Sequence, residues 1–566
     1  MTNEKFFPIG PVVRAAIATA AMLFLVGDNA ENRLLLHILF FVGFFAVFSR
    51  DDRQMMRPKS RGAIPAAVLA LWVILPGMSF DGMTAKTLIS ALLHGGCLWF
   101  LLAQLLNWLY GKTPEGREAG TEKGKAGQLF CLSFCLLWVS CLLLFLNQYP
   151  GSLSCDTTDQ LAQALGLSPF ENANPFFHTL VLTVCIRLGL AVFGNINAAV
   201  AVYTVAQFTM VCAVFAFCVV TIFRKTGSKL LLVFSQLFFN ALPLNLVYAT
   251  GMWKDTFFAA LFLLTITYGW DLLTRERVSG RSWVCLSLLA MAAALARNSG
   301  WSSLLVWGIV LALWGRKQGI RWRKAGQAIL CGSLAAVAVM LVVYPALGIR
   351  DNGPVTTALS VPLQQVARVA ARGGEIGQED LQLIQEVVDV QALAECYDET
   401  ISDPVKRIVD DAALQQRMGE FGKLWLRLGI QNPGIYLDAY LKQMQGYWDL
   451  NNMDWVWDHS IFENEFGVMR TPLLLGSVDL TALFLSIPKM YLIQRKGIVL
   501  WVLVVLFGCA VEKKNALAQA MFAPMLMIYA GLFLTSPAAL FRYIYPVAVC
   551  VPLMLALPRV TGRMEK

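Results

Sequence analysis

The sequence predicts an all-α membrane protein that crosses the bilayer about 15 or 16 times, and three observations support this prediction. Hydrophobic residues make up 57% of the chain and charged residues only 15%, which exceeds the apolar content that a soluble domain needs. Apolar runs of membrane-spanning length recur along most of the chain. Many connections between these runs carry Lys and Arg, as cytoplasmic loops do.

Residues 349–472 interrupt the pattern of spans. This stretch holds 10 Lys+Arg and 19 Asp+Glu, a net charge of −9, so the rest of the chain carries +18. An acidic domain outside the membrane and basic loops inside it explain the overall charge of +9. That charge therefore does not indicate nucleic acid as a partner, and no nucleic-acid-binding signature appears. Amphipathic spacing predicts that this external domain is mainly helical.

The chain divides into four predicted parts. Residues 1–126 form a four-span N-terminal extension, residues 127–348 a membrane core, residues 349–472 the external domain, and residues 473–566 the C-terminal spans. No cleavable signal peptide is evident near the N-terminus. The individual spans are expected at residues 12–27, 34–48, 63–80, 87–110, 128–146, 176–194, 198–223, 230–249, 256–270, 283–296, 301–314, 325–348, 473–493, 498–511, 520–535 and 544–557.

Basic connections set the expected orientation. The connectors at 50–61 and 111–127 are rich in Lys and Arg, which places them and the N-terminus in the cytoplasm and sends span 128–146 outward. The pattern then conflicts with itself, because a full crossing at 176–194 would leave the basic turn 224–229 outside. Arg187 lies in the middle of that run, where a charge is costly. A re-entrant or short segment would remove the conflict, and the topology around 498–545 is open as well.

The loop at 147–178 is acidic, contains no Lys or Arg, and is too long for a simple connection. A Pro150-Gly151 turn precedes Asp156, and the spacing over residues 157–167 predicts a short helix lying on the bilayer surface. Asp156 held in this way is a candidate general base toward a hydroxyl group. The alternatives are that Asp156 only caps the helix, or that Asp159, one turn further on, is the base.

Other polar clusters are expected at the same face. Lys254 and Asp255 precede one span, Arg297 ends another, and Arg542 with Tyr543 opens the last. Guanidinium and ammonium groups bind phosphate, so Lys254, Arg297 and Arg542 are candidates for contact with a lipid-borne phosphate, which Asp255 would orient. The alternative is ordinary interfacial anchoring of span ends, in which Lys extends its ammonium group toward water.

The external domain and the histidines offer weaker signals. Gln364, Gln365 and Arg368 have helical spacing and would line a sugar site or simply form an ordinary helix surface. The Trp-rich stretch 454–459 fits a carbohydrate contact or an interface between domain and membrane. With four His and none at ligand spacing, we predict no dedicated metal site and no cofactor, although a divalent metal is not excluded.

These motifs together resemble the GT-C fold glycosyltransferases, and most closely a multi-span branch from Gram-positive bacteria. Each motif is short, and their order and spacing over residues 147–550 carry the resemblance. The chain differs from these proteins in having four spans before the core and in lacking the paired acidic residues of some relatives. The matching pieces are Pro150-Gly151 with Asp156 and Gln160, Pro175 with His178-Thr179, Lys254-Asp255, Arg297-Asn298 with Gly300, Pro362 to Gln365 with Arg368, and Arg542-Tyr543 with Pro546.

The resemblance implies a GT-C-like membrane core and sugar transfer at the outer face from a polyprenyl-phosphate-linked donor. Asp156 would be the catalytic base, and Gln160 and His178 would contact substrate. The acceptor would be a cell-envelope glycan, a teichoic-type polymer or a surface protein. The alternative is a transporter or flippase of lipid-linked saccharides, in which Arg187 and Asp479 would line a pathway through the membrane.

Overall fold

The computed structural model describes residues 62–113, 123–350, 353–452, 460–487 and 495–560, with a few isolated positions before residue 62. These residues are predominantly helical, and extended pairing among them is confined to isolated bridges. Eight of the described helices are long and apolar enough to cross a membrane, or nine if one bent pair is a single span. The predicted polytopic all-helical class is therefore confirmed. The spans expected at 12–27 and 34–48 lie almost entirely outside the described residues.

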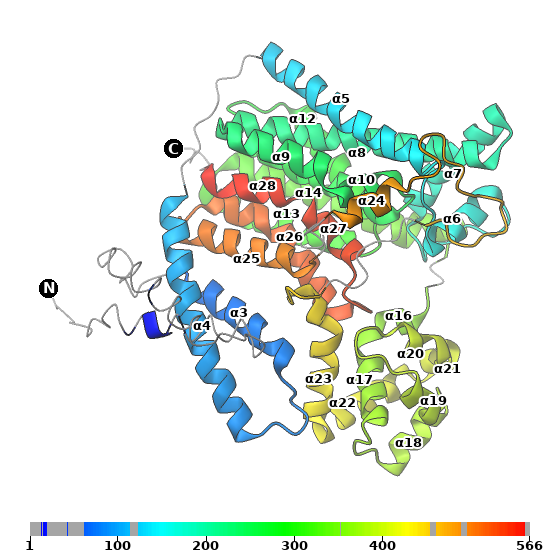
Figure 1. The fold of residues 1–566 in the computed structure, drawn as a ribbon. Helices are drawn as coiled ribbons and strands as arrows, with labels where there is room; N and C mark the ends of the chain where they lie inside the picture. Colours follow the sequence, from blue (N-terminus) through cyan, green and yellow to red (C-terminus); the bar gives the residue numbers. More distant parts are fainter. Residues whose placement is uncertain are drawn as a thin grey trace.

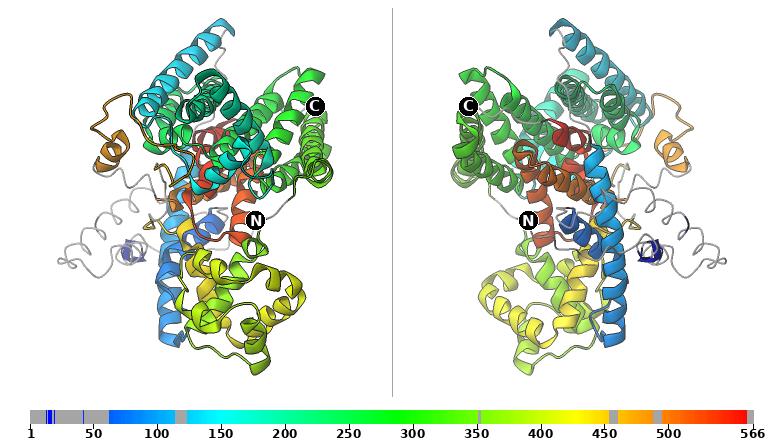
Figure 2. Two further views of the ribbon diagram at one scale, coloured as in Figure 1. Left: turned by 90° about the vertical axis from the view of Figure 1, so that its right-hand side faces the viewer. Right: turned by 90° about the vertical axis from the view of Figure 1, so that its left-hand side faces the viewer.

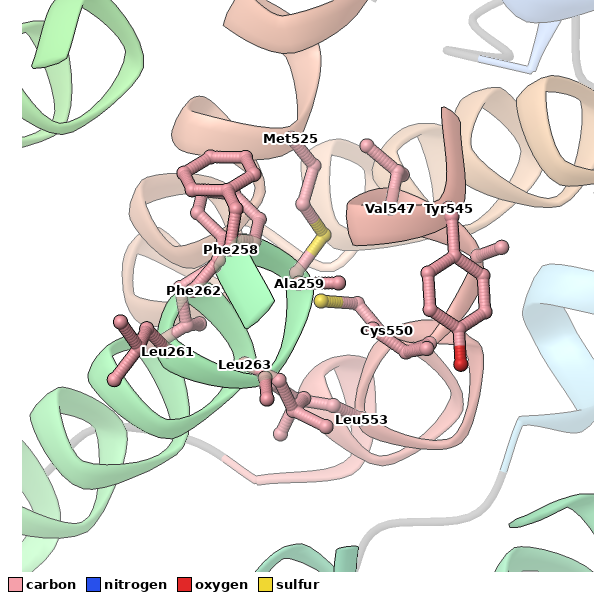
Figure 3. Packing of buried hydrophobic residues seen from close by; sticks show 14 of the residues in the cluster. Phe258, Ala259, Leu261, Phe262, Leu263, Met525, Tyr545, Val547, Cys550 and Leu553 are labelled. Atoms are coloured by element: carbon pink, nitrogen blue, oxygen red, sulfur yellow. The ribbon is translucent and has the colours of Figure 1, made fainter. Parts of the chain in front are cut away.

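The membrane body is a bundle of helices (Figure 1). Among the candidate spans, α11 is the most buried. Phe258 and Phe262 of α11 pack with Met525, Cys550 and Leu553 from the C-terminal helices, so segments distant in sequence share one core (Figure 3). The bundle consists of α5 (Lys123–Asn147), α8 (Ile196–Thr226), α9 (Lys229–Ala241), α10 (Pro243–Thr250), α11 (Lys254–Thr274), α12 (Gly280–Leu295), α13 (Gly300–Gln318), α14 (Ile320–Ala338) with its extension through Val339–Val343 and α15 (Tyr344–Ala346), α25 (Gly497–Glu512), α26 (Ala516–Thr535), α27 (Phe541–Ala548) and α28 (Val551–Ala556).

Two predicted spans have a different form. The span expected at 230–249 is broken into α9 and α10, which meet at an angle of 54°. Pro243 explains the break, since proline lacks an N–H donor and keeps Leu242 before it extended. The span expected at 473–493 is wrong over the described residues: α24 (Leu480–Ser486) has only seven residues, and Asn147 donates to the Val478 carbonyl at 2.8 Å, which holds this segment at the end of α5.

The two ends of the bundle differ in charge. At one end, which we call the loop end, α5 finishes at Asn147 and α11 begins at Lys254. At the opposite end, which we call the basic end, Lys225 of α8 lies 3.4 Å from Asp271 of α11. Arg321 donates to the backbone carbonyl of Arg275, so the connections after α11 and α13 meet at this end as well. The basic connections therefore gather on one side of the bundle.

Helix α7 (Phe176–Phe193) is long and apolar enough to cross a membrane, yet both of its ends lie at the loop end. Near its start, Phe177 contacts Phe257 in the first turn of α11, with 5.9 Å between ring centroids. Near its finish, Gly189 packs so closely on Ala199 in the first turn of α8 that a Cβ would lie 2.5 Å from the Ala199 Cα. The chain therefore stays at the loop end over the length of α7, and α8 carries residues 224–229 to the basic end.

Arg187 and the C-terminal spans fit the same arrangement. The Arg187 guanidinium donates to the Ala164 carbonyl at 3.3 Å, so its charge lies beside α6 (Cys155–Leu165).

Helix α25 starts where Lys496 donates to the Ala539 carbonyl at 2.7 Å and ends where Lys513 donates to the Thr113 carbonyl at 2.8 Å. Helix α26 returns to the loop end, and α27 with α28 runs back.

A separate helical domain follows α15 and packs around its own core, which includes Leu363, Val366 and Leu424. Its α23 lies beside the N-terminal hairpin of α3 (Ala63–Ile74), η1 (Leu75–Gly77) and α4 (Ala85–Lys112) (Figure 2). The domain consists of α16 (Val355–Ala358), α17 (Ser360–Ala371), α18 (Gln378–Gln385), α19 (Val390–Glu395), α20 (Asp403–Ile408), α21 (Asp411–Gln416), α22 (Met418–Gln431), α23 (Pro433–Met444) and η3 (Gln445–Tyr447).

Candidate functional site

The loop after α5 is fixed to the bundle by its backbone. Gly151 has φ +119°, and a Cβ there would lie 2.7 Å from Thr204 Oγ1, so the position requires glycine. Ser152 pairs with Gly251, and the Met252 N–H donates to the Ser152 carbonyl at 3.0 Å. These contacts hold the start of α6 directly over the start of α11.

Asp156 lies in the first turn of α6 and is bound by two cations from elsewhere in the chain. Its Oδ2 atom is 3.0 Å from Lys254 Nζ at the start of α11 and 3.0 Å from Arg542 Nη1 on α27. The residue at the N-cap position is Ser154, and the side-chain bonds of Asp156 go to the two cations. The interpretation of Asp156 as a helix cap is therefore wrong.

The charges around Asp156 set its acidity. Partial burial raises the pKa of this carboxyl, but the charges and hydrogen bonds of Lys254 and Arg542 outweigh burial and lower the pKa to about 2. The Asp156 side chain remains 29% exposed. Asp159 is exposed one turn further on, and burial together with the negative charges of Asp156 and Glu171 raises its pKa. The surroundings thus lower the pKa of Asp156 and raise the pKa of Asp159.

The far side of the loop closes against the same group. The Lys254 ammonium also donates to the side-chain carbonyl of Asn174, and the Asn174 amide donates to the Asp156 carbonyl at 3.4 Å. Asn298, which follows α12, donates to the Asn172 carbonyl at 2.7 Å. Sequence reasoning gave Asn174 and Asn298 no chemical role, because asparagines in polar loops carry no distinctive pattern.

Arg297 and Tyr543 extend the group of charges. Arg297 Nη1 is 3.7 Å from Asp255 Oδ1 and 3.4 Å from the Tyr543 carbonyl, to which it donates. Arg542 donates to the Tyr543 hydroxyl at 3.2 Å, and both guanidinium groups lie over the Tyr543 ring, at 5.0 Å for Arg542 and 5.7 Å for Arg297. We call the group of Asp156, Lys254, Asp255, Arg297, Arg542 and Tyr543 the charged cluster.

The charged cluster has the chemistry of an anion site. Its three cations exceed its two carboxylates by one charge. The Nε atom of Arg542 is buried and has no hydrogen-bond partner within the described part of the chain. Because an unpaired buried donor is costly, an acceptor atom of a ligand would stabilise it. Arg542 and Lys254 present donors toward one point, at which Asp156 now lies. A phosphate oxygen would satisfy the same donors.

Gln160 and His178 lie beside the charged cluster but are fully buried. His178 Nδ1 is 3.0 Å from Gln160 Oε1, and His178 Nε2 is 2.6 Å from the Tyr203 hydroxyl, which donates to Gln207 at 2.7 Å. The network joins α6, α7 and α8, so both residues position the helix that carries Asp156. Contact with substrate, as expected from the sequence, does not fit this burial. The i,i+4 spacing of Tyr203 and Gln207 within an apolar span was the available signal.

Gln364, Gln365 and Arg368 lie elsewhere, in the interior of the helical domain. Arg368 donates to the Tyr397 hydroxyl at 3.0 Å and lies 3.6 Å from Asp438. All three are less than one-tenth exposed, so the description of an ordinary helix surface is wrong. Their side chains bond to other residues of the same domain, an arrangement that does not fit an open sugar site. The Trp-rich stretch 454–459 falls outside the described residues.

A pocket of about 510 Å³ opens beside the loop and is lined by Gln148, Gly151, Arg470, Asp479 and parts of residues 460–469, without the charged cluster. Within the described part of the chain, no three His, Cys, Asp or Glu side chains form a group that could hold a metal ion.

The fold and the charged cluster together define a polytopic helical membrane protein with a charged site at one end of its bundle. Residues 167–562 match the model of DUF6020, described as a family of unknown function, and because this match covers more than half of the chain, the protein belongs to that family. The match includes Lys254, Arg297 and Arg542 and begins after Asp156. No curated protein and no solved structure matches the chain.

Proposed function

We propose that the protein is a membrane glycosyltransferase of the GT-C type, which moves a sugar from a polyprenyl-phosphate-linked donor to an acceptor hydroxyl outside the membrane. The observation that carries this proposal is the position of Asp156 between Lys254 and Arg542 at the loop end. A carboxylate for proton transfer and cations for a phosphate leaving group are the two requirements of this chemistry.

The charge distribution supports an orientation. Since positive connections stay in the cytoplasm, the basic end faces inward, and the charged cluster and helical domain face the outside of the cell membrane. The expected cytoplasmic N-terminus lies outside the described residues. A donor with a polyprenyl chain would then reach the charged cluster from the outer leaflet, and a cell-envelope acceptor would reach it from outside.

The low pKa of Asp156 requires that the donor binds before Asp156 acts as a base. With both cations bound to it, Asp156 is too acidic to be an effective base. Binding of the donor phosphate to Lys254 and Arg542 would release the carboxylate and raise its pKa. Asp156 then accepts the proton of the acceptor hydroxyl. The oxygen attacks the anomeric carbon with inversion, the bond from that carbon to phosphate oxygen breaks, and the phosphate leaves with its charge neutralised by the cations.

A lipid-linked-saccharide flippase is the second candidate, and one observation favours it. The broken pair α9 and α10, bent by 54°, is a feature of transporters. The residues expected to line the pathway do not lie inside the bundle, however. Arg187 bonds to Ala164 of α6, and Asp479 lies at the end of α5, where it accepts from Gln148 at 2.9 Å and lies 3.3 Å from Arg470.

The test is reconstitution of the purified protein into proteoliposomes with a lipid-linked saccharide fraction and a cell-envelope acceptor. Mass spectrometry follows the release of free polyprenyl phosphate and the gain of sugar mass on the acceptor. Transfer in the wild type supports the proposal. Movement of intact lipid-linked saccharide between leaflets without transfer would replace it with the flippase.

A further inference from the structure

Helix α22 has two apolar faces, and only one of them is covered. One face packs into the core of the helical domain through Leu424 and Leu428, which are fully buried. The second face presents Met418, Leu426 and Ile430 at intervals of four or eight residues, and they are 37%, 58% and 81% exposed. Contiguous exposed apolar side chains mark interaction surfaces on proteins. The described residues supply no cover for this face.

Leu437 on α23 is also apolar and 40% exposed, and we call Met418, Leu426, Ile430 and Leu437 the apolar patch. Its height relative to the membrane follows from a nearby contact. A Cβ at Gly434, in the first turn of α23, would lie 2.7 Å from the Phe80 carbonyl, so the start of α23 touches the turn that leads into α4. The apolar patch therefore lies near the loop-end terminus of a candidate span.

The surface of α4 continues the apolar character of the patch. Leu88 and Leu92, in the first turns of α4, are 43% and 66% exposed, as side chains that face lipid are. Figure 1 shows the start of α23 beside the turn that leads into α4. The helix pair that bears the apolar patch therefore touches the turn from which α4 and its exposed leucines begin.

We propose that the apolar patch is inserted into the outer leaflet, so that α22 anchors the helical domain flat against the bilayer. Apolar faces of interfacial helices lie about 5–10 Å into the boundary between headgroups and acyl chains. The exposed Lys423 beside the patch has the charge to meet headgroup phosphates. The occupant is the membrane in which the protein already lies, and the proposal does not depend on the glycosyltransferase activity.

The anchor has a physical purpose that the charge of the domain makes clear. Residues 349–472 carry a net charge of −9, so an anionic leaflet repels the domain. Burial of apolar side chains in the leaflet opposes that repulsion and keeps the domain beside the charged cluster at the loop end.

The experiment uses the full-length protein in lipid nanodiscs that contain phosphatidylglycerol with a diazirine in its acyl chain. After illumination, peptide mass spectrometry maps the lipid adducts. We expect adducts on residues 418–437 and on the first turns of α4, which serve as the positive control. We expect none on α19, a helix of the same domain that Figure 1 shows on the far side of the domain from α22. Adducts on α4 without any on residues 418–437 would overturn the proposal.

Two variants sharpen the measurement. Ile430→Asn should remove the adducts from α22 and leave those on α4, while Glu395→Gln, an exposed position on α19, should change neither. If Ile430→Asn prevents folding, the adduct map of the wild type still decides. Cross-links between two copies of α22, obtained with an amine-reactive reagent at Lys423, would show that a second copy covers the patch and would refute the lipid anchor.

Discussion

Replacing Asp156 with Asn separates the chemical role of this side chain from its structural one. In the wild type an aspartate pKa of about 2, against an ordinary value of 3.8, corresponds to about 2 kcal/mol favouring the ionised form. Because the folded-state pKa is depressed, this stabilisation is present above about pH 4 and is lost between about pH 4 and pH 2. Asp156→Asn should therefore cost about 2 kcal/mol of folding stability at neutral pH.

Loss of the base should cost far more in rate than in stability. General base catalysis contributes about a hundredfold to ten-thousandfold, so Asp156→Asn should reduce sugar transfer in proteoliposomes by at least about a hundredfold. Expression level and elution as a single species in detergent establish that the variant is folded. The matched control is Asp159→Asn, one turn along the same helix, which should keep most of the activity.

Two outcomes would refute this reasoning. Transfer at the wild-type rate by folded Asp156→Asn would exclude the residue as the base. Loss of activity in Asp159→Asn alone would move the base one turn along α6, where the raised pKa of Asp159 is closer to the working pH of a base.

Three further changes test the site and its support. Lys254→Met should raise the KM for the lipid-linked donor and raise the pKa of Asp156, which appears as an acid limb in the pH–rate profile; an unchanged profile would contradict the ion pair. Gly151→Ala should lower stability by about 1–3 kcal/mol, measured by thermal unfolding in detergent, with Gly166→Ala, which has a positive φ in open space, as the milder control. Asp438→Asn should expose residues 79–81, which the Asp438 carboxylate holds by hydrogen bonds, to proteolysis. Resistance equal to that of the wild type would contradict this role of Asp438.

The reason for the last prediction is a carboxylate that sequence reasoning did not single out. Asp438 is buried on α23 and accepts from Ser79 Oγ at 2.8 Å and from the N–H groups of Phe80 and Asp81 at 2.8 and 3.1 Å. Arg368 lies 3.6 Å away as its counter-charge. Asp438 therefore joins the helical domain to the N-terminal hairpin, and Arg368 serves this junction.

The sequence predicted the membrane class and the residues of the charged cluster because both depend on simple physical patterns. Repeated apolar runs of spanning length are typical of membrane-spanning helices. Charged residues at the ends of such helices lie at the interface between the membrane and water. The contacts among Asp156, Lys254 and Arg542 needed the fold, because their helices are adjacent in space and distant in sequence. The positions of charged residues at span ends identified the candidate site residues. The packing of the helices determines which of these residues contact one another.

The predictions that the structure did not confirm also share a physical cause. Length and hydropathy alone do not say which end of the bundle each end of a helix reaches. Helix α7 is long and apolar enough to cross a membrane, yet both of its ends lie at the loop end. Likewise, a polar side chain such as Gln160 or Gln364 on a helix looks available in a sequence. Its burial depends on partners, Thr179 and Asp398 in these two cases, that no local pattern reveals.

The separation of Asp156 and Arg542 by 386 residues has a consequence for how the protein is made. Asp156 leaves the ribosome early and Arg542 nearly last, so the second cation of the pair arrives only when the final helices insert. Until then the early half of the chain holds an aspartate with a single partner, Lys254. A chain that stops before residue 542 would insert most of its helices and still lack a finished site. Completion of synthesis is in this sense the step that assembles the charged cluster.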